Sequence, residues 1–223
     1  MDVEKRNAAE AAHSIIGIGS GSTVIHVVNE FARLDNKGLI FIPTSFQARD
    51  LLVSNNLKVG DLVQYPNIDI TFDGADEIVL NNNILIKGGG GALLMEKIIA
   101  YSSEELIIVA DSSKLSNRIF ERWKKGLPIE VHTKAQSVVS NKLIKLLPKC
   151  SAIVRQAVHK AGPIITDNGN IIIDLHINED NIDVVKLNQE ISKIPGVIET
   201  GLFIGMASKI FIAEETKIIT KEY

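Results

Sequence analysis

Short runs of Ile, Val and Leu alternate with segments of helical periodicity through the first half of this 223-residue chain. The runs lack the apolar–polar alternation of half-exposed strands, as expected for strands that are buried on both faces. They predict strands at residues 14–19, 39–42, 68–72 and 106–110. The intervening segments repeat apolar residues every three to four positions and predict helices at residues 23–34, 46–54 and 92–101. Such strand–helix alternation favours an α/β fold built on a parallel sheet with helices on both sides.

The pattern changes near Gly126. Further strands are predicted at residues 127–131, 152–158, 170–175 and from Val197 onward, with helices at residues 134–147 and 182–194. The resulting order β-α-β-β-α-β, over roughly 75 residues, is that of a split, ferredoxin-like unit. An apolar run at residues 209–213 predicts one more strand, which we expect to return to the first sheet, whereas residues 214–223 give no prediction.

Composition excludes several classes of function. The 24 Lys and Arg residues are balanced by 27 Asp and Glu residues, and this net charge of −3 excludes a basic nucleic-acid surface as the main function. Cys150 is the single cysteine, which excludes an intrachain disulfide and a cysteine-based zinc site and fits a reducing compartment. The charged residues 1–6 lead into no apolar segment, and no apolar run reaches ~18 residues. We therefore expect no signal peptide, no membrane association and a cytoplasmic location.

Ligands of an open parallel sheet bind beyond the carboxyl ends of its strands, and the loop after the first strand is suited to an anion. It contains Gly19, Ser20, Gly21, Ser22 and Thr23. Glycines let backbone amides approach a phosphate, hydroxyls add donors, and the helix N-terminus adds positive partial charge. We prefer a monophosphate pocket to a plain capped turn. A dinucleotide site is disfavoured because Ser22 replaces the third glycine, and a Walker loop because no lysine precedes Ser22 or Thr23.

A second loop, after the third strand, contains Asp73, Gly74, Ala75, Asp76 and Glu77. Three acids within five residues repel one another unless a cation or an array of sugar hydroxyls lies among them. A solvated turn has a similar composition and is the simpler alternative for this loop taken alone.

A third loop begins at Lys87 and continues through Gly88, Gly89, Gly90 and Gly91. Consecutive bare amides can form an anion-binding nest, beside the charge of Lys87. Glu96 follows, about one and a half turns into the predicted helix, where a partly apolar environment would raise its pKa toward that of a general base. From the spacing alone, an exposed glutamate beside Lys97 is the simpler interpretation. Lys114 is a further cation placed after a strand.

The remaining chemistry-bearing residues add no metal or nucleophile motif. The histidines show no metal-ligand spacing at His13, His26, His132, His159 and His176, and no Gly-x-Ser-x-Gly elbow is present. The sequence therefore offers two loops lined by hydrogen-bond acceptors, two lysines, a turn suited to a phosphate and a candidate base. This combination is suited to an enzyme that abstracts the proton next to the carbonyl group of a sugar phosphate. Lysine and amide hydrogen bonds would stabilise the developing enediolate.

Taken together, these motifs resemble those of the ribose-5-phosphate isomerases of type A, from the first strand almost to the C-terminus. The resemblance rests on residues 19–23, 44–45, 73–77, 87–91, 96–98, 110–114, 166–170, 195–197 and 201–203. Single motifs are weak, but their order and spacing are specific. Ser20 stands where many members have Thr, Thr200 where Asn is common, and residues 46–49 replace a frequent run of small residues.

The resemblance implies reversible conversion of ribose 5-phosphate to ribulose 5-phosphate in the non-oxidative pentose phosphate pathway, without metal or organic cofactor. It implies a Rossmann-like domain of residues 1–126 and 204–223, with a ferredoxin-like lid or oligomerisation domain of residues 127–203. Glu96 would be the base that moves a proton between C1 and C2. Asp73 and Asp76 would serve sugar hydroxyls and ring opening, and Lys87 the enediolate oxygen.

The resemblance further implies a substrate site and an oligomer. The site would be lined by Ser20, Gly21, Ser22, Thr23, Asp73, Gly74, Ala75, Asp76, Lys87, Gly88, Gly89, Gly90 and Lys114. The serine and threonine loop, with Lys114, would take the phosphate. We expect a homodimer or homotetramer.

Two alternatives remain from the sequence. One is a different enzyme of similar fold, such as an amino-sugar phosphate deaminase or a sugar-lactone hydrolase, against which the pair of Lys87 and Glu96 argues. The other is a sugar-phosphate sensor, which would need the phosphate loop but no carboxylate near C1 and C2.

Overall fold

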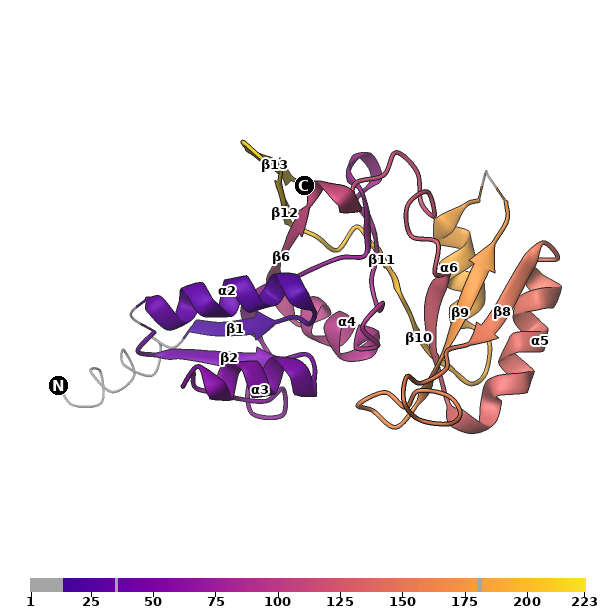
Figure 1. Cartoon of the computed structure of the whole chain (residues 1–223), viewed down its shortest axis with the longest axis horizontal. Helices are drawn as coiled ribbons and strands as arrows, with labels where there is room; N and C mark the ends of the chain where they lie inside the picture. Colours follow the sequence, from indigo (N-terminus) through magenta and orange to yellow (C-terminus); the bar gives the residue numbers. More distant parts are fainter. Residues whose placement is uncertain (1–13, 35, 180–181) are drawn as a thin grey trace.

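The computed structural model describes residues 14–34, 36–179 and 182–223. The charged N-terminal segment and His13, both considered above, lie outside these residues. Figure 1 shows the chain in two parts, with residues 14–34 and 39–54 at one end and residues 136–177 and 184–192 at the other.

The first part is built on a six-stranded sheet, which confirms the predicted α/β class with a mostly parallel sheet. Its strands, in spatial order, are β13 (Ile218–Glu222), β12 (Lys209–Ala213), β6 (Ser103–Asp111), β3 (Ile68–Asp73), β1 (Ser14–Ile18) and β2 (Leu39–Pro43). Neighbouring strands are parallel except β13, which runs antiparallel to β12. The late strand β12 therefore returns to this sheet, as the sequence predicts.

Helices cover both faces of this sheet because successive residues of a buried strand point to opposite sides. On one face, Ile16 and Ile18 pack in a cluster with buried residues of α2 (Ser22–Arg33) and α3 (Phe46–Ser54). On the other, Ile15 packs in a cluster with Ile99 of α4 (Leu93–Tyr101). The sheet is thus held between α2 and α3 on one side and α4 on the other.

The second part is a four-stranded antiparallel sheet of spatial order β10-β7-β9-β8. Its elements follow the chain as β7 (Leu127–Val131), α5 (Gln136–Leu146), β8 (Cys150–Val154), β9 (Ile171–Ile177), α6 (Val184–Ser192) and β10 (Val197–Thr200). The predicted β-α-β-β-α-β order is confirmed. A crossover helix joins β7 to β8 with β9 between them, which is the ferredoxin-like arrangement.

A small three-stranded sheet that the sequence does not predict connects the two parts. It consists of β4 (Glu77–Val79), β5 (Ile84–Ile86) and β11 (Leu202–Ile204). Its Ile78, Leu85 and Phe203 pack against β6 and β12 of the first sheet. Val79 and Ile86 of the same strands pack into the core of the second sheet. One thin sheet therefore contributes to both cores.

Several predicted boundaries are wrong, and each error has a local reason. The strand predicted at 152–158 is β8 and ends at Val154, because the chain beyond it pairs with residues 163–164 instead of β9: Arg155 O accepts from the Ile164 amide and Gln156 forms an isolated bridge with Pro163. The helix predicted from residue 134 is preceded by a 3-10 turn, Thr133–Ala135. The unassigned C-terminal segment contains the strand β13, whose residues are mostly exposed and so carry no apolar signal. Glu96 lies in the first turn of α4, nearer the helix start than expected.

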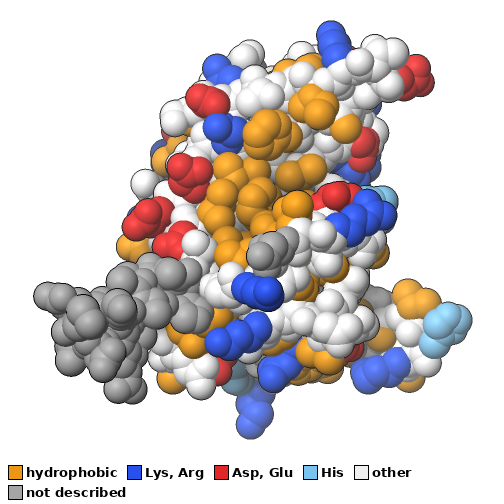
Figure 2. Space-filling model, turned by 90° about the vertical axis from the view of Figure 1, so that its left-hand side faces the viewer, with side chains coloured by type: hydrophobic (Ala, Val, Ile, Leu, Met, Phe, Trp, Pro, Cys, Tyr) orange, Lys and Arg blue, Asp and Glu red, His pale blue; other side chains and the backbone are white. Residues whose placement is uncertain are grey.

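The surface of the molecule carries apolar as well as charged side chains. Figure 2 shows hydrophobic side chains gathered in a band along the middle of one face, with charged residues on either side. Val63, Tyr101 and Ile218 are among the large hydrophobic residues that are exposed. In the described part of the chain, none of the helices has the length and apolar character needed to cross a bilayer.

Candidate active site

The predicted loops meet in one small pocket of about 140 Å³ beyond the carboxyl ends of the strands. It is lined by Ser20, Gly21, Ser22, Thr23, Gly74, Ala75, Asp76, Lys87, Gly88, Gly89, Gly90, Glu96 and Lys114. Of the predicted site residues, only Asp73 is absent from this lining, because it lies behind Lys87 with its side chain 1% exposed. The structure thus brings together residues that are up to 94 positions apart, from Ser20 to Lys114.

The first loop presents the N-terminus of α2 to the pocket. Gly21 is the N-cap with a φ of 99°, a conformation that L side chains rarely adopt, and it has no side chain to cap the helix. The Ser20 hydroxyl hydrogen-bonds to Thr44 Oγ1 at 2.8 Å and to Ser45 Oγ at 2.6 Å. Gln47 Oε1 accepts from the Gly21 amide at 2.9 Å. Gln47 belongs to the residues that vary from the family pattern, and nothing in the sequence indicated this contact.

The side chains of the three acids in the second loop point in different directions and bind different donors. Asp73 Oδ1 accepts from the Gly74 amide at 2.7 Å, and Asp76 Oδ2 accepts from the Gly89 amide at 2.7 Å. Glu77 turns away from the pocket and is fully buried, where it accepts from the backbone amides of Phe120 and Arg122. The repulsion expected between neighbouring acids is therefore relieved, since each carboxylate has its own donors.

The glycines of the third loop let it pass close to its neighbours. A β-carbon at Gly89 would lie 2.6 Å from Asp76 Oδ1, and Gly88 has a φ of 98°. Arg155, from the second part of the chain, donates to the carbonyls of Gly88 at 2.9 Å and Gly89 at 3.1 Å. Its guanidinium is held in turn by both carboxylate oxygens of Asp174. This clamp joins positions so far apart in sequence that no local pattern could indicate it.

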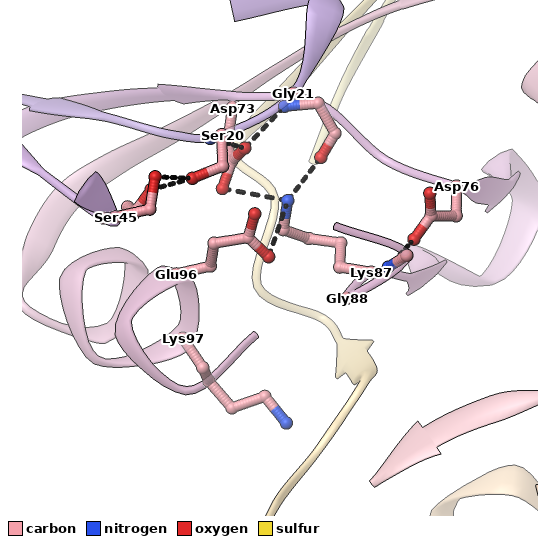
Figure 3. Close-up of polar contacts among 12 residues, drawn as sticks. Ser20, Gly21, Ser45, Asp73, Asp76, Lys87, Gly88, Glu96 and Lys97 are labelled. Atoms are coloured by element: carbon pink, nitrogen blue, oxygen red, sulfur yellow. Dashed lines mark hydrogen bonds and ion pairs between the residues drawn. The ribbon is translucent and has the colours of Figure 1, made fainter. Parts of the chain in front are cut away.

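Lys87 is the centre of the site (Figure 3). Its side chain is only 3% exposed, and its ammonium donates to Gly74 O at 2.5 Å. The same Nζ lies 2.9 Å from Asp73 Oδ2 and 3.4 Å from Glu96 Oε2. Burial alone would lower the pKa of Lys87, but the carboxylates of Asp73 and Glu96 outweigh it and raise the pKa. Lys87 therefore remains an ammonium at neutral pH.

Glu96 is buried beside this ammonium rather than exposed on the helix surface. Burial raises the pKa of Glu96 from 4.5 to about 8, and the nearby charges of Asp73 and Asp76 act in the same direction, while Lys87 opposes them. A carboxyl group with such a pKa exchanges protons readily near neutral pH, which is the property a general base needs.

Lys114 completes the pocket wall from the 3-10 turn Ser112–Lys114, directly after β6. Asp111 caps this turn by accepting from the Ser113 amide at 2.8 Å. Among the residues that the structure describes, no group of three or more His, Cys, Asp and Glu side chains is placed to hold a metal ion.

The arrangement combines an anion-friendly helix N-terminus and lysine with a buried carboxyl–ammonium pair. A pocket of this kind can bind a small phosphorylated molecule and move a proton on the carbon beside a polarised oxygen. The family model of ribose 5-phosphate isomerase A (phosphoriboisomerase A) matches residues 40–217. This chain belongs to the ribose 5-phosphate isomerase A family.

Curated members of the family match over nearly the whole chain. A ribose-5-phosphate isomerase of Candida albicans is 46% identical over 206 residues, covering 90% of this chain and 85% of the relative. One from Dictyostelium discoideum is 48% identical over 203 residues, covering 89% of this chain and 85% of the relative.

Solved structures of the family share the fold. Ribose 5-phosphate isomerase A from Methanocaldococcus jannaschii has a TM-score of 0.87 at 35% identity, covering 98% of this chain and 96% of its own. A D-ribose-5-phosphate isomerase in complex with phospho-erythronic acid has a TM-score of 0.87 at 34% identity, covering 100% of this chain and 99% of its own.

The raised pKa of Glu96 predicts a pH dependence of stability that is independent of any assay of activity. The folded chain holds the Glu96 proton up to about pH 8, whereas the unfolded chain releases it near 4.5. Between these values the folded state binds more protons, so the free energy of unfolding falls as pH rises and levels off above about pH 8. Relative to Glu96→Gln, wild-type stability should fall by on the order of 1–4 kcal/mol across this range.

Urea denaturation of wild type and Glu96→Gln at several pH values measures this difference. Glu104→Gln, at an exposed position of β6, is the matched control and should follow the wild type. A difference between wild type and Glu96→Gln that does not change with pH would show that Glu96 titrates normally.

Proposed function

We propose that this chain interconverts D-ribose 5-phosphate and D-ribulose 5-phosphate through an enediolate, without a metal or organic cofactor. The observation that carries the proposal is the buried pair of Glu96 and Lys87, with Oε2 and Nζ 3.4 Å apart in the wall of the pocket. Family membership and the phospho-erythronic acid complex of a related isomerase support the choice of substrate.

The proton transfer follows from this pair. Glu96 removes the proton from C2 of the open-chain aldose, and negative charge develops on O1. The same carboxyl group returns that proton to C1, while the hydroxyl proton moves from O2 to O1, which gives the ketose. No other atom is gained or lost, so one carboxyl group serves as base and then as acid.

Lys87 stabilises the oxygen on which charge develops. Its Nζ donates a hydrogen bond to Gly74 O and forms ion pairs with Asp73 Oδ2 and Glu96 Oε2. The contact to Glu96 is the longest of these, so it is the one that a substrate oxygen replaces. The buried ammonium then acts on the enediolate through a charge-assisted hydrogen bond, which is stronger than a neutral one.

The other site residues bind and orient the substrate. The Ser22 and Thr23 end of the pocket, at the N-terminus of α2, takes the phosphate together with Lys114. Asp76 lines the pocket with its Oδ2 held by the Gly89 amide, which leaves Oδ1 placed for a sugar hydroxyl and for ring opening. Asp73 is shielded from the pocket by Lys87, so its role is to orient Lys87 rather than to contact the sugar.

The first test is incubation of chelator-treated protein with ribose 5-phosphate in D₂O, followed by NMR of the product. Ketose that carries solvent deuterium at the exchanging carbon is the expected result, because a carboxyl group exchanges its proton during the enediolate lifetime. Ketose without label would mean a shielded proton or a hydride shift. Binding without turnover would reassign the chain to sugar-phosphate sensing.

Glu96→Gln should abolish catalysis and keep binding. The amide has nearly the shape of the carboxyl group but cannot accept the proton, so we expect kcat to fall by at least about 10³-fold. Affinity for 4-phosphoerythronate, measured by calorimetry, should change little. Turnover close to that of the wild type would remove Glu96 from the role of base.

We also propose that the protein is a cytoplasmic homo-oligomer. The hydrophobic band of Figure 2 supports self-association, because contiguous apolar surface on a folded protein marks an interaction site. Light scattering coupled to size-exclusion chromatography should give two or four times the chain mass of 24.4 kDa. A single species of 24.4 kDa at micromolar concentration would contradict this prediction.

A further inference from the structure

Lys97, the residue after Glu96, is also largely buried and leaves α4 in a different direction (Figure 3). Its ammonium donates to Glu199 Oε1 at 2.8 Å and to Thr200 O at 2.6 Å. Both acceptors belong to β10, in the second part of the chain. Lys97 therefore ties the helix that carries the candidate base to a strand of the other sheet.

The polar contacts of Lys97 add to the apolar contacts that hold α4. Leu93, Ile99 and Ala100 are the buried hydrophobic residues of the helix, and they lie on the same face as Glu96. A roll of the helix by about 10° moves a side-chain end that lies ~5–6 Å from the axis by about 1 Å. Lys97 lies about 100° around the helix from Glu96, at the edge of the buried face, and its bonds to β10 oppose such a roll.

The segment that holds Lys97 also holds Lys87. Gly201 O accepts from the Lys87 amide at 2.9 Å. The fully buried ring of Phe203 lies 4.8 Å from Lys97 Nζ and 5.5 Å from Lys87 Nζ. Residues 199–203 thus set the positions of both partners of the Glu96–Lys87 pair, one through Lys97 and one directly.

We propose that Lys97 is a positioning residue for the isomerisation, which holds Glu96 at the correct distance from Lys87 and the substrate by fastening α4 to Glu199 and Thr200. This inference rests on the proposed function. Lys97 lines no part of the pocket.

A purely structural role would predict a different residue here. Burial lowers the pKa of Lys97, and Glu199 only partly offsets this, so the buried ammonium is energetically unfavourable. Apolar side chains of similar volume commonly replace buried ion pairs with no loss of stability. A charged anchor adds directional hydrogen bonds, which specify geometry where packing alone does not.

The test is steady-state kinetics of Lys97→Met, which keeps the length of the side chain and removes the ammonium. We expect kcat to fall about 10- to 100-fold, as a displacement of about 1 Å at a reacting group produces. KM, and the affinity for 4-phosphoerythronate measured by calorimetry, should change less than about threefold, because the binding loops are untouched.

Variants of the partner and a matched lysine complete the design. Glu199→Ala should reproduce the loss in kcat, and Glu199→Gln should lose less, since its amide oxygen still accepts from Lys97. The double variant Lys97→Met, Glu199→Ala should be no worse than the worse single variant, because both break one contact. Lys193→Met removes an exposed lysine that pairs with Glu190 and should keep wild-type kinetics.

The proposal would be overturned if Lys97→Met folds and its kcat stays within about threefold of the wild-type value. It would also be overturned if the variant loses kcat and affinity for 4-phosphoerythronate to the same extent. If Lys97→Met does not fold, Glu199→Ala is judged by the same two criteria, since Glu199 is more exposed than Lys97. An inactive wild type would overturn the proposed function, and this inference with it, whereas an active wild type with an unaffected variant overturns the inference alone.

Discussion

One buried ammonium, Lys87 Nζ, organises the site, and much of the surrounding structure serves to hold it. Three carboxylates converge on this region, and Asp73 and Glu96 contact the ammonium directly. Isolated charges in a dry interior are strongly unfavourable, so each of these groups depends on the others for its stability. Burial raises the pKa of Asp73 as well as that of Glu96, while the contact with Lys87 and two backbone amide donors act to lower the pKa of Asp73.

The three-stranded sheet brings this ammonium to the pocket. Lys87 directly follows β5, and its backbone amide is bound by Gly201, just before β11. Since the same sheet packs into the cores of both parts of the chain, a displacement of either part is transmitted to Lys87. Arg155 adds a second connection, from the end of β8 to the carbonyls of Gly88 and Gly89. The site is thus built where the two parts meet, although most of its lining comes from the first.

The sequence predicts those features whose cause is local. Buried parallel strands appear as apolar runs, and the loops after them hold nearly all residues that line the pocket. The three-stranded sheet could not be predicted, since its strands are three residues long and β11 pairs with β5 across more than 100 positions. The contacts of Gln47, Lys97 and Arg155 could not be predicted either, because each joins residues that are far apart in the sequence. Burial of Glu96 also depends on tertiary packing, and the spacing of the helix alone favoured an exposed side chain.

Opposing influences act on Glu96: burial raises its pKa, whereas the ammonium of Lys87 lowers it. Its place in the first turn of α4 favours the ionised form, because the helix N-terminus carries positive partial charge worth about 0.3–1 kcal/mol at exposed positions. Desolvation acts in the other direction and is larger, so the pKa rises to about 8. The burial that causes this desolvation also strengthens the hydrogen bond from Lys87 to a developing oxyanion. The reactivity of the base and the stabilisation of the intermediate therefore have one physical origin, the burial of Glu96 and Lys87 in the wall of the pocket.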